Sequence, residues 1–318
     1  MGQVVVKHRK DHKWLESGRP TKKGVMVHPN QNPDGLLWGK VFMKSLMATP
    51  NALDVYYEPG FNSLRHSHPL DEIFYIFSGT LHVNGYDLKQ GSVAFVPKNT
   101  MYGPEYTGDD GVYFIRVELW DTDTGRPDGT KGGEMGAGPT LRWWEGALHA
   151  DGRPEAKQPD PAVKPADRSK KGALGALAAN GNDKPWIESI QPVAGGTTEG
   201  KVFIRTLLSP TPNIVEGWCA PGVVRQHRSN LVDKLFLITD GELSIDGQKL
   251  TRGSVAFVPK NVEYSVEATS SNGARYVRAY LLDSDVPNPE VGRAPMAGES
   301  RPWAGPLTAE GLPDVRAA

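Results

Sequence analysis

Three side chains in one short stretch of the sequence have the types and the spacing that suit a metal ion. His66 and His68 lie two residues apart, so both imidazoles fall on one face of a strand, because strand side chains alternate. Glu72 follows four residues later, after a turn that contains Pro69, and its carboxylate can return to the same point as the next strand begins. Two nitrogens and one oxygen that converge on one position outline a metal site.

The composition of the chain excludes several classes of partner. Its 318 residues carry a formal net charge of −1 and the pI is about 6.7, which leaves no electrostatic footprint for nucleic acid or an anionic membrane. We therefore expect a small-molecule substrate. The one cysteine, Cys219, rules out an internal disulfide and fits a reducing compartment, although it equally fits a small buried apolar residue. Without a signal-peptide pattern or a membrane-spanning run, the sequence predicts a soluble, cytoplasmic protein.

The sequence contains an internal duplication. Gly91–Asn99 recurs letter for letter as Gly253–Asn261, which lies 162 residues later. Segments that contain tryptophan near the ends of both copies extend the repeat outward, and Trp14 corresponds to Trp186. A period of this length predicts two copies of one domain. We expect a first domain over residues 1–154, a linker rich in Ala, Lys, Pro, Gly and Asp over 155–185, and a second domain over 186–318.

Each copy is expected to be a series of short strands. Val, Ile, Phe and Tyr are concentrated in short runs between Gly, Pro, Asn-Gly and Asp-Gly turn signals, which is typical of antiparallel strands in a sandwich or barrel. An insertion near residues 18–34, which includes His28, is expected to form a loop over the site of the first copy, and 126–139 a second loose segment. The strands predicted for the first copy span residues 40–47, 53–57, 72–78, 80–83, 92–96 and 112–120.

The spacing of the motifs resembles that of the cupin superfamily. The first cupin motif is matched by Gly60, His66, His68, Glu72 and Gly79, and the second is matched by Gly91 and Pro97 but has Tyr102 where the family has a histidine. The resemblance covers both copies. It implies an all-β bicupin of two double-stranded β-helix (jelly-roll) domains, with a metal in the mouth of a barrel that keeps its ligands.

The second copy does not keep those ligands. At the constant offset, the two histidines and the glutamate become Arg228, Asn230 and Lys234, and protonated Arg and Lys have no lone pair for a metal. His227 falls on the neighbouring position, so we expect it to point away from the barrel interior. We therefore predict a second barrel without a metal, which either completes the fold and an interface or uses Arg228 and Lys234 to hold an anionic ligand.

Further residues are candidates around the predicted site. Tyr102 is a candidate catalytic residue, as a proton donor or base, although ligation of the metal or a packing role remain alternatives because Tyr264 matches it in the second copy. Tyr57 and Arg116 are candidates for substrate binding. A structural ion pair is an alternative for Arg116, since Arg278 is its counterpart. His82 is expected to point away from the barrel, and surface positions are expected for His8, His12 and His149.

Three protein ligands leave coordination positions open for chemistry. With Fe(II), the site would admit substrate and O2 together, and the resemblance to ring-cleaving bicupins favours a dioxygenase acting on a small oxygenated organic molecule. With Zn, Mn or Ni, the same residues suit a redox-neutral lyase, isomerase or cyclase. A non-catalytic bicupin that binds a ligand is the third hypothesis. We expect one divalent metal ion per chain, and the tryptophan-bearing arms suggest a homodimer.

Overall fold

The computed structural model describes most of the chain. The described residues are almost entirely strands and turns, so the prediction of an all-β protein is confirmed. No helix within them is long and apolar enough to cross a membrane. The described residues are 3–17, 19–20, 26–27, 40–63, 65–120, 137, 141–155, 177–190, 200–209, 212–227, 230–283, 285–289 and 299–315.

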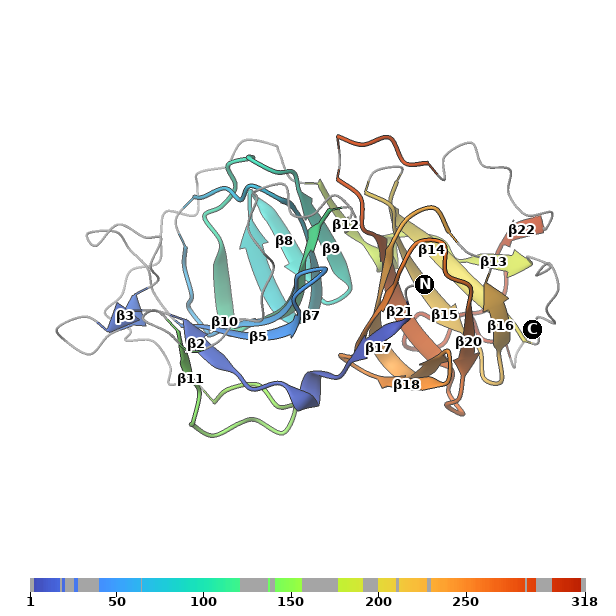
Figure 1. Cartoon of the computed structure of the whole chain (residues 1–318), viewed down its shortest axis with the longest axis horizontal. Helices are drawn as coiled ribbons and strands as arrows, with labels where there is room; N and C mark the ends of the chain where they lie inside the picture. The colour runs from blue at the N-terminus through green and yellow to red at the C-terminus, as the bar shows by residue number, and fades with distance from the viewer. Residues whose placement is uncertain are drawn as a thin grey trace. The chain divides into compact units, whose positions relative to one another are not determined.

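The chain forms two compact units of strands (Figure 1). The first barrel consists of residues 9–120 together with the later described residues up to 180. The second barrel consists of residues 3–8 and the described residues from 181 to 315. Two tandem barrels are what the internal duplication predicts, and the tandem jelly-roll architecture is confirmed.

The sheet of the first barrel has antiparallel neighbours in the order β11-β2-β5-β6-β10-β7-β9-β12, and β8 pairs with β7. A separate two-stranded pair joins β3 and β4. The bounds are β2 Leu15–Ser17, β3 Arg19–Pro20, β4 Met26–Val27, β5 Val41–Met47, β6 Ala52–Tyr57, β7 Asp71–Val83, β8 Tyr86–Lys89, β9 Ser92–Val96, β10 Tyr106–Leu119, β11 Leu141–Trp143 and β12 Leu177–Asn180, and the 3-10 helix η1 spans Arg9–Asp11.

The sheet of the second barrel follows the order β1-β19-β17-β21-β15-β14-β13-β22, with β18 and β20 on β17 and β16 on β20. The bounds are β1 Val5–Lys7, β13 Ile187–Ile190, β14 Val202–Leu208, β15 Ile214–Cys219, β16 Val224–His227, β17 Lys234–Ile245, β18 Gln248–Thr251, β19 Val255–Val258, β20 Tyr264–Ala268, β21 Ala274–Tyr280 and β22 Glu299–Pro302, and η2 spans Gly181–Asp183.

The predicted strands of the first copy are present, with two differences. The runs 72–78 and 80–83 form one continuous strand, β7, because Gly79 takes a positive φ of 76° and carries the chain through without a break. The last predicted strand, 112–120, begins earlier, at Tyr106, and its register against β7 shifts twice. The Asp-Gly turn signal Asp110-Gly111 therefore lies inside β10.

The leading strands of the two copies are exchanged. β1 pairs with β19 in the second barrel, and β12 pairs with β9 in the first barrel. The two compact units therefore differ from the predicted domains, which span 1–154 and 186–318 with a linker at 155–185. Residues 3–8 belong to the second barrel, and the end of the predicted linker forms a strand of the first barrel. The edge of a sheet exposes unpaired backbone groups, and each leading strand covers one such edge. The boundaries elsewhere stay predictions.

Alternation along the strands separates an apolar inner face from a polar outer face. In β5 and β6 the side chains of Val41 and Val55 pack inward in the core of the first barrel. On the outer face of the same strands lie Lys44 and Asp54, both buried by the chain segments that cross over them. The inner face is therefore free to carry a site while the outer face anchors the arms.

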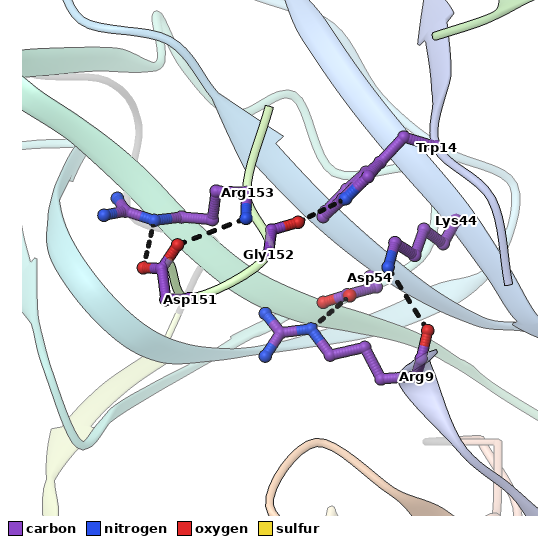
Figure 2. Close-up of polar contacts among 7 residues, drawn as sticks. All are labelled: Arg9, Trp14, Lys44, Asp54, Asp151, Gly152 and Arg153. Carbon is purple, nitrogen blue, oxygen red and sulfur yellow. Dashed lines mark hydrogen bonds and ion pairs between the residues drawn. The ribbon is translucent and has the colours of Figure 1, made fainter. Parts of the chain in front are cut away.

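A buried polar network on that outer face fixes the arms of the first barrel (Figure 2). Nε of Arg9 lies 2.8 Å from Oδ2 of Asp54, and Nζ of Lys44 donates to the carbonyl oxygen of Arg9 at 3.2 Å. Trp14 Nε1 donates to the carbonyl oxygen of Gly152 at 2.7 Å, and Lys44 Nζ lies 4.7 Å from the Trp14 ring centroid. The network joins η1, two central strands and the segment after β11.

The second barrel repeats this network with other residues. Trp186 Nε1 donates to the carbonyl oxygen of Gly311 at 2.8 Å. Arg205 takes the place of the lysine, its guanidinium carbon 4.4 Å from the Trp186 ring centroid, and its Nε donates to Glu216 at 2.5 Å. The recurrence shows that the tryptophan arms have the same structural role in both copies.

Asp54 predicts a specific dependence of stability on pH. Burial raises its pKa to about 6, although Arg9 and Lys44 act in the opposite direction. Because this folded-state pKa lies above the ordinary value of 3.8, the folded protein keeps a proton that the unfolded chain has released. The stabilising contribution is therefore present below about pH 4 and is lost as the pH rises through 6, by about 3 kcal/mol in total.

In Asp54→Asn this loss should disappear. The difference in free energy of unfolding between wild type and variant, measured with urea at several pH values between 4 and 6, should fall by about 2 kcal/mol, the part of the total that is lost in this range. Asp151→Asn is the control, because the pKa of Asp151 is lowered and it titrates below this range. A constant difference between wild type and Asp54→Asn across the range would contradict the assignment.

Gly79 offers a second test of the fold. A Cβ at this position would lie 2.1 Å from the carbonyl oxygen of Gly111, whereas a Cβ at Gly91, which has a similar positive φ, would face open space. We expect Gly91→Ala to cost about 1 kcal/mol, the strain of the left-handed backbone alone. Gly79→Ala should cost several times more in thermal or urea unfolding. Equal costs would show that the close approach to Gly111 does not matter.

Candidate functional site

The backbone of the first barrel holds the two histidines against the loop that precedes β10. His66 and Tyr102 form an isolated antiparallel bridge, with His66 N to Tyr102 O at 3.0 Å and Tyr102 N to His66 O at 2.9 Å. The backbone nitrogen of Asn99 donates to the carbonyl oxygen of His68 at 2.7 Å. The motif segment and the loop are thereby fixed to each other at the start of β7.

The side chains of the first motif meet at this point. The ring centroids of His66 and His68 lie 5.0 Å apart, and the His66 centroid lies 4.4 Å from that of Tyr102. His68 Nδ1 is 3.6 Å from Oε1 of Glu72, whose side chain is fully buried. The hydroxyl of Tyr102 donates to Oε2 of Glu72 at 3.5 Å. The predicted metal ligands and the predicted catalytic tyrosine therefore form one cluster.

A cavity of about 480 Å³ opens beside the cluster. Its walls include the two residues predicted to bind substrate, Tyr57 and Arg116. The other walls combine apolar and aromatic residues with polar ones, among them Arg65 and Glu105, so the cavity suits a small organic molecule that has both apolar and polar groups. Further lining residues are Val41, Met43, Val55, Phe61, Phe74 and Phe114.

Arg116 is both a wall of the cavity and a member of an ion-pair network. Its guanidinium lies 3.4 Å from Glu72 Oε1 and 3.6 Å from Glu118 Oε1. Burial alone would lower the pKa of Arg116, but the two carboxylates raise it, so the charge is retained. The position of Arg116 is therefore compatible with a structural ion pair and also with contact to a substrate.

Glu105 is a buried carboxylate at the site that sequence reasoning missed. Its Oε2 accepts from the hydroxyl of Tyr57 at 3.3 Å and from that of Ser63 at 3.4 Å. Its Oε1 is buried and accepts no hydrogen bond from the part of the chain that the structure describes. Burial raises the pKa of Glu105, and the charge of His66 acts against this increase.

The duplication hid Glu105 because Glu267 occupies the matching position in the sequence. In the first barrel Thr107 N donates to the carbonyl oxygen of Phe61, and in the second barrel Ala268 N donates to the carbonyl oxygen of Val223. At the constant offset of 162 the second donor would be residue 269, so the second barrel has one residue fewer before this hydrogen bond. A valine, not the second glutamate, therefore faces inward where Glu105 does. No signal in the sequence marks this shift.

The same shift overturns the prediction for His227, which is wrong. His227 pairs with Tyr264 as His66 pairs with Tyr102, and the ring centroids of His227 and Tyr264 lie 4.7 Å apart in nearly parallel planes. His227, and not Arg228 as the constant offset predicted, therefore takes the place of His66. Arg228 itself lies outside the described residues.

Burial dominates the acid-base properties of the cluster. It raises the pKa of Glu72 to about 7, against the effect of Arg116. Burial, followed by the carboxylates of Glu72 and Glu105, also raises the pKa of Tyr102 well above its usual range. The phenol of Tyr102 is thus protonated and acts as a hydrogen-bond donor toward Glu72.

The donor set fits a divalent metal in its chemistry. Oε1 of Glu72 is buried and accepts no hydrogen bond from the described residues, although the Arg116 guanidinium lies 3.4 Å away, so the carboxylate still has a lone pair that could bind a cation. Two ligands bound at about 2.1 Å lie roughly 3 to 3.5 Å apart, close to the separation of His68 Nδ1 and Glu72 Oε1. However, no group of three or more His, Cys, Asp or Glu side chains in the described ranges is arranged to hold a metal ion. The three-ligand set stays a prediction.

The remaining histidines lie elsewhere. His82 points away from the barrel interior, as predicted: its Nδ1 lies 2.5 Å from the exposed Asp87, and its ring stacks on Tyr106. His149 is exposed near Glu155. His8 is half-buried in the second barrel, where its Nδ1 lies 3.0 Å from Ser254 Oγ. His12 is half-buried, and His28 and its insertion loop fall outside the described residues apart from the short β3–β4 pair.

Comparisons with known proteins agree with this architecture. Residues 53–118 match the Cupin domain family. A solved structure from Nostoc punctiforme PCC 73102, titled a "putative dioxygenase", aligns with 11% identity and a TM-score of 0.54 over 90% of this chain and 85% of its own. Oxalate decarboxylase from Bacillus subtilis aligns with 16% identity and a TM-score of 0.48 over 83% and 86%. The first likeness shows a shared fold, and the second is too weak to carry an argument. No match was found among curated protein sequences.

The matched domain and the duplicated barrels define the class of fold. Residues 53–118 of the first barrel match a cupin domain, and the tandem barrels have the fold of a bicupin. Its two barrels differ in the charges that they enclose, because the first gathers carboxylates and histidines while the second has Lys234 in the position of Glu72.

The ion pairs of Arg116 predict a difference between the barrels in stability. Arg116→Gln leaves Glu72 and Glu118 without their shared cation, and we expect a loss on the order of 2 to 3 kcal/mol in the free energy of unfolding. Arg278→Gln is the matched control, since no carboxylate occupies the equivalent positions there. It should cost much less, or stabilise the protein. Equal losses in urea unfolding would show that the carboxylate pairs do not stabilise the first barrel.

Proposed function

We propose that the first barrel is the active site of a metal-dependent enzyme that acts on a small oxygenated organic molecule. The single observation that carries this proposal is the buried Oε1 of Glu72, which accepts no hydrogen bond from the described residues and lies 3.6 Å from Nδ1 of His68 and 3.4 Å from the Arg116 guanidinium, beside a cavity that His66 and His68 line. In this proposal His66, His68 and Glu72 hold the metal. A dioxygenase reaction with Fe(II) is the form we favour.

The charge of the site supports a bound cation. Three carboxylates are buried at the site, and the guanidinium of Arg116 pairs with two of them, Glu72 and Glu118, but not with Glu105. Burial opposes this concentration of negative charge: it raises the pKa of Glu72 to about 7 and also raises the pKa of Glu105. A divalent cation would compensate the excess, and its ligands would then be held as carboxylate and neutral imidazole.

The cavity supports a substrate with a flat, apolar body. Phe61 and Tyr57 pack with ring centroids 4.0 Å apart and planes tilted by 32°, and Tyr57 contacts Phe114 edge to face at 5.0 Å. Such a wall excludes water and accepts an aromatic or enol ring against its faces. In the proposed reaction Arg116, a charged group in the cavity wall, binds an oxygen atom of the substrate and orients it.

A divalent metal held by His66, His68 and Glu72 would supply a Lewis-acid centre with open coordination positions, which as Fe(II) could take both substrate and O2. Tyr102 contributes a proton at its hydroxyl, because its raised pKa keeps the phenol protonated. That proton points at Oε2 of Glu72 and can stabilise negative charge that develops on a substrate oxygen nearby.

A redox-neutral lyase, isomerase or cyclase that uses Zn, Mn or Ni is the second candidate. It is favoured by Glu105, a buried carboxyl with a raised pKa that borders the cavity and has one oxygen without a described hydrogen bond. A carboxyl held in this way is suited to take up or deliver a proton to a substrate without any change of oxidation state.

Replacing the histidines tests the metal proposal. We expect His66→Ala and His68→Ala to remove the metal and at least a hundredfold of activity while the fold is retained, because neither side chain is needed for the core. His82→Ala is the matched control, since His82 lies outside the barrel. Metal content of the purified proteins is measured by elemental analysis together with circular dichroism. Full metal content in both site variants would overturn the assignment.

The reaction class is tested with the wild-type protein. Iron in the purified protein and substrate-dependent O2 uptake over a panel of phenols and diketones would support the dioxygenase. Turnover under nitrogen would instead support the redox-neutral reaction, and Glu105→Gln should then slow it more than it changes metal content. If metal is bound but neither assay shows turnover, the non-catalytic hypothesis stands and the enzyme proposal fails.

A further inference from the structure

The ends of the two copies fold into the same turn. In the first barrel the backbone nitrogen of His149 donates to the carbonyl oxygen of Arg153 at 2.8 Å, and in the second barrel that of Thr308 donates to the carbonyl oxygen of Leu312 at 2.8 Å. The same isolated β-bridge closes both turns. Leu312 therefore occupies the position that Arg153 has in the first barrel.

In the first barrel this turn places a cation against an aromatic ring on the outer face. Nε of Arg153 lies 2.5 Å from Oδ2 of Asp151, a pair that Figure 2 shows. The guanidinium carbon of Arg153 lies 5.3 Å from the ring centroid of Tyr56. Tyr56 in turn stacks on Phe42, with ring centroids 6.0 Å apart. A carboxylate, a guanidinium and a ring thus form one unit, and the attraction between cation and ring stabilises it.

The second barrel keeps the carboxylate and the ring of this unit but not the cation. Glu310 stands where the first barrel has the aspartate, and Trp218 stands where it has the tyrosine, stacked on Phe203 with ring centroids 5.4 Å apart. Leu312, which replaces the arginine, packs against the apolar core of the barrel. Glu310 and Trp218 therefore lack the guanidinium that joins their counterparts.

A cavity of about 620 Å³ opens at this place. Trp218, Glu310 and Leu312 line it together with two further acids, Asp240 and Asp314. None of the described residues that line the cavity is a lysine or an arginine. The first copy has a serine at the position of Asp240, so the second copy carries an additional negative charge here.

The cation that flanks the cavity is bound to another partner. Arg275 lies opposite Trp218 in the strand register, and its guanidinium binds Glu216, whose side chain is fully buried. Glu310 accepts a hydrogen bond from the hydroxyl of Thr308, which lowers the pKa of its carboxyl, so this group is ionised at neutral pH. The cavity therefore presents a negative charge that Arg275 does not neutralise.

We propose that the cavity binds a small organic cation, a guanidinium or an alkylammonium compound, whose charged group takes the place that Arg153 has in the first barrel. The charge pairs with the Glu310 carboxylate, and the N–H donors of a guanidinium match both carboxylate oxygens. Tryptophan is the aromatic side chain that attracts cations most strongly. The cavity is larger than the charged group alone, so it also has room for the body of an organic molecule.

The full-length protein provides the test, with three probes of similar shape. Butylguanidine and butylamine are charged at neutral pH, and N-butylurea is the neutral counterpart of butylguanidine. Each cation, at millimolar concentration, should raise the melting temperature in a saturable manner beyond any effect of sodium chloride at the same ionic strength, and N-butylurea should not. Tighter binding of butylguanidine than of butylamine in isothermal titration identifies a guanidinium ligand, and the reverse order identifies an ammonium ligand.

Variants locate the site. Leu312→Arg restores the residue of the first barrel, so the chain's own guanidinium should fill the cavity and weaken binding at least tenfold, with a melting temperature that equals or exceeds that of the wild type. Glu310→Gln, at an exposed position, should also weaken binding at least tenfold. Glu263→Gln is the matched control, because it removes an exposed carboxylate of the second barrel that does not line the cavity. Glu105→Gln, in the first barrel, should also keep full binding.

Two results would overturn the proposal. One is that the charged probes stabilise the protein no more than N-butylurea or sodium chloride does. The other is binding that persists undiminished in both Leu312→Arg and Glu310→Gln. Because these measurements require neither a metal nor turnover, the outcome is independent of whether the proposed function of the first barrel holds.

Discussion

An arginine enclosed on the inner face of each barrel determines which charges its neighbours can carry. A guanidinium remains protonated at any accessible pH, so it requires negative partners wherever water is excluded. In the first barrel Glu72 and Glu118 provide them, at 3.4 and 3.6 Å from Arg116. The carboxylates in turn exceed the single guanidinium, and this excess makes the mouth of the first barrel suitable for a cation. In the second barrel Lys234 and Tyr280 occupy the positions of those carboxylates, and the guanidinium of Arg278 lies 5.0 Å from the Tyr280 ring centroid.

The architecture allows the two barrels to diverge in this way because each strand separates its two faces. The outer faces share one plan, in which a tryptophan donates to the carbonyl oxygen of a glycine, Gly152 or Gly311, and a cation lies over its ring. These contacts hold the arms and do not involve the barrel interior. The inner faces can therefore exchange a carboxylate for an amine at one position without disturbing the anchors, since alternate side chains never meet across a strand.

The sequence was sufficient to predict the duplication, the all-β barrels and the candidate cluster, because these depend on exact recurrence, on local alternation and on a spaced motif. It could not reveal three features. Glu105 escaped notice because an identical residue occupies the matching position in the other copy. His227 was assigned the wrong direction because one residue fewer separates two hydrogen bonds in the second barrel, which a constant offset cannot detect. The exchange of β1 and β12 depends on which sheet edge is left uncovered, a property of the folded barrels that no local pattern carries.

The tyrosine that both barrels share follows from the same electrostatic constraint. A phenol both donates and accepts hydrogen bonds. In the first barrel the hydroxyl of Tyr102 donates to Glu72 at 3.5 Å, and in the second the hydroxyl of Tyr264 accepts from Lys234 at 3.5 Å. A histidine at this position would have to change its tautomer or its charge to serve both partners, whereas the hydroxyl only has to rotate. The residue that replaces the family's histidine therefore tolerates a carboxylate in one barrel and an ammonium group in the other, so its presence in both copies is compatible with a chemical role in the first.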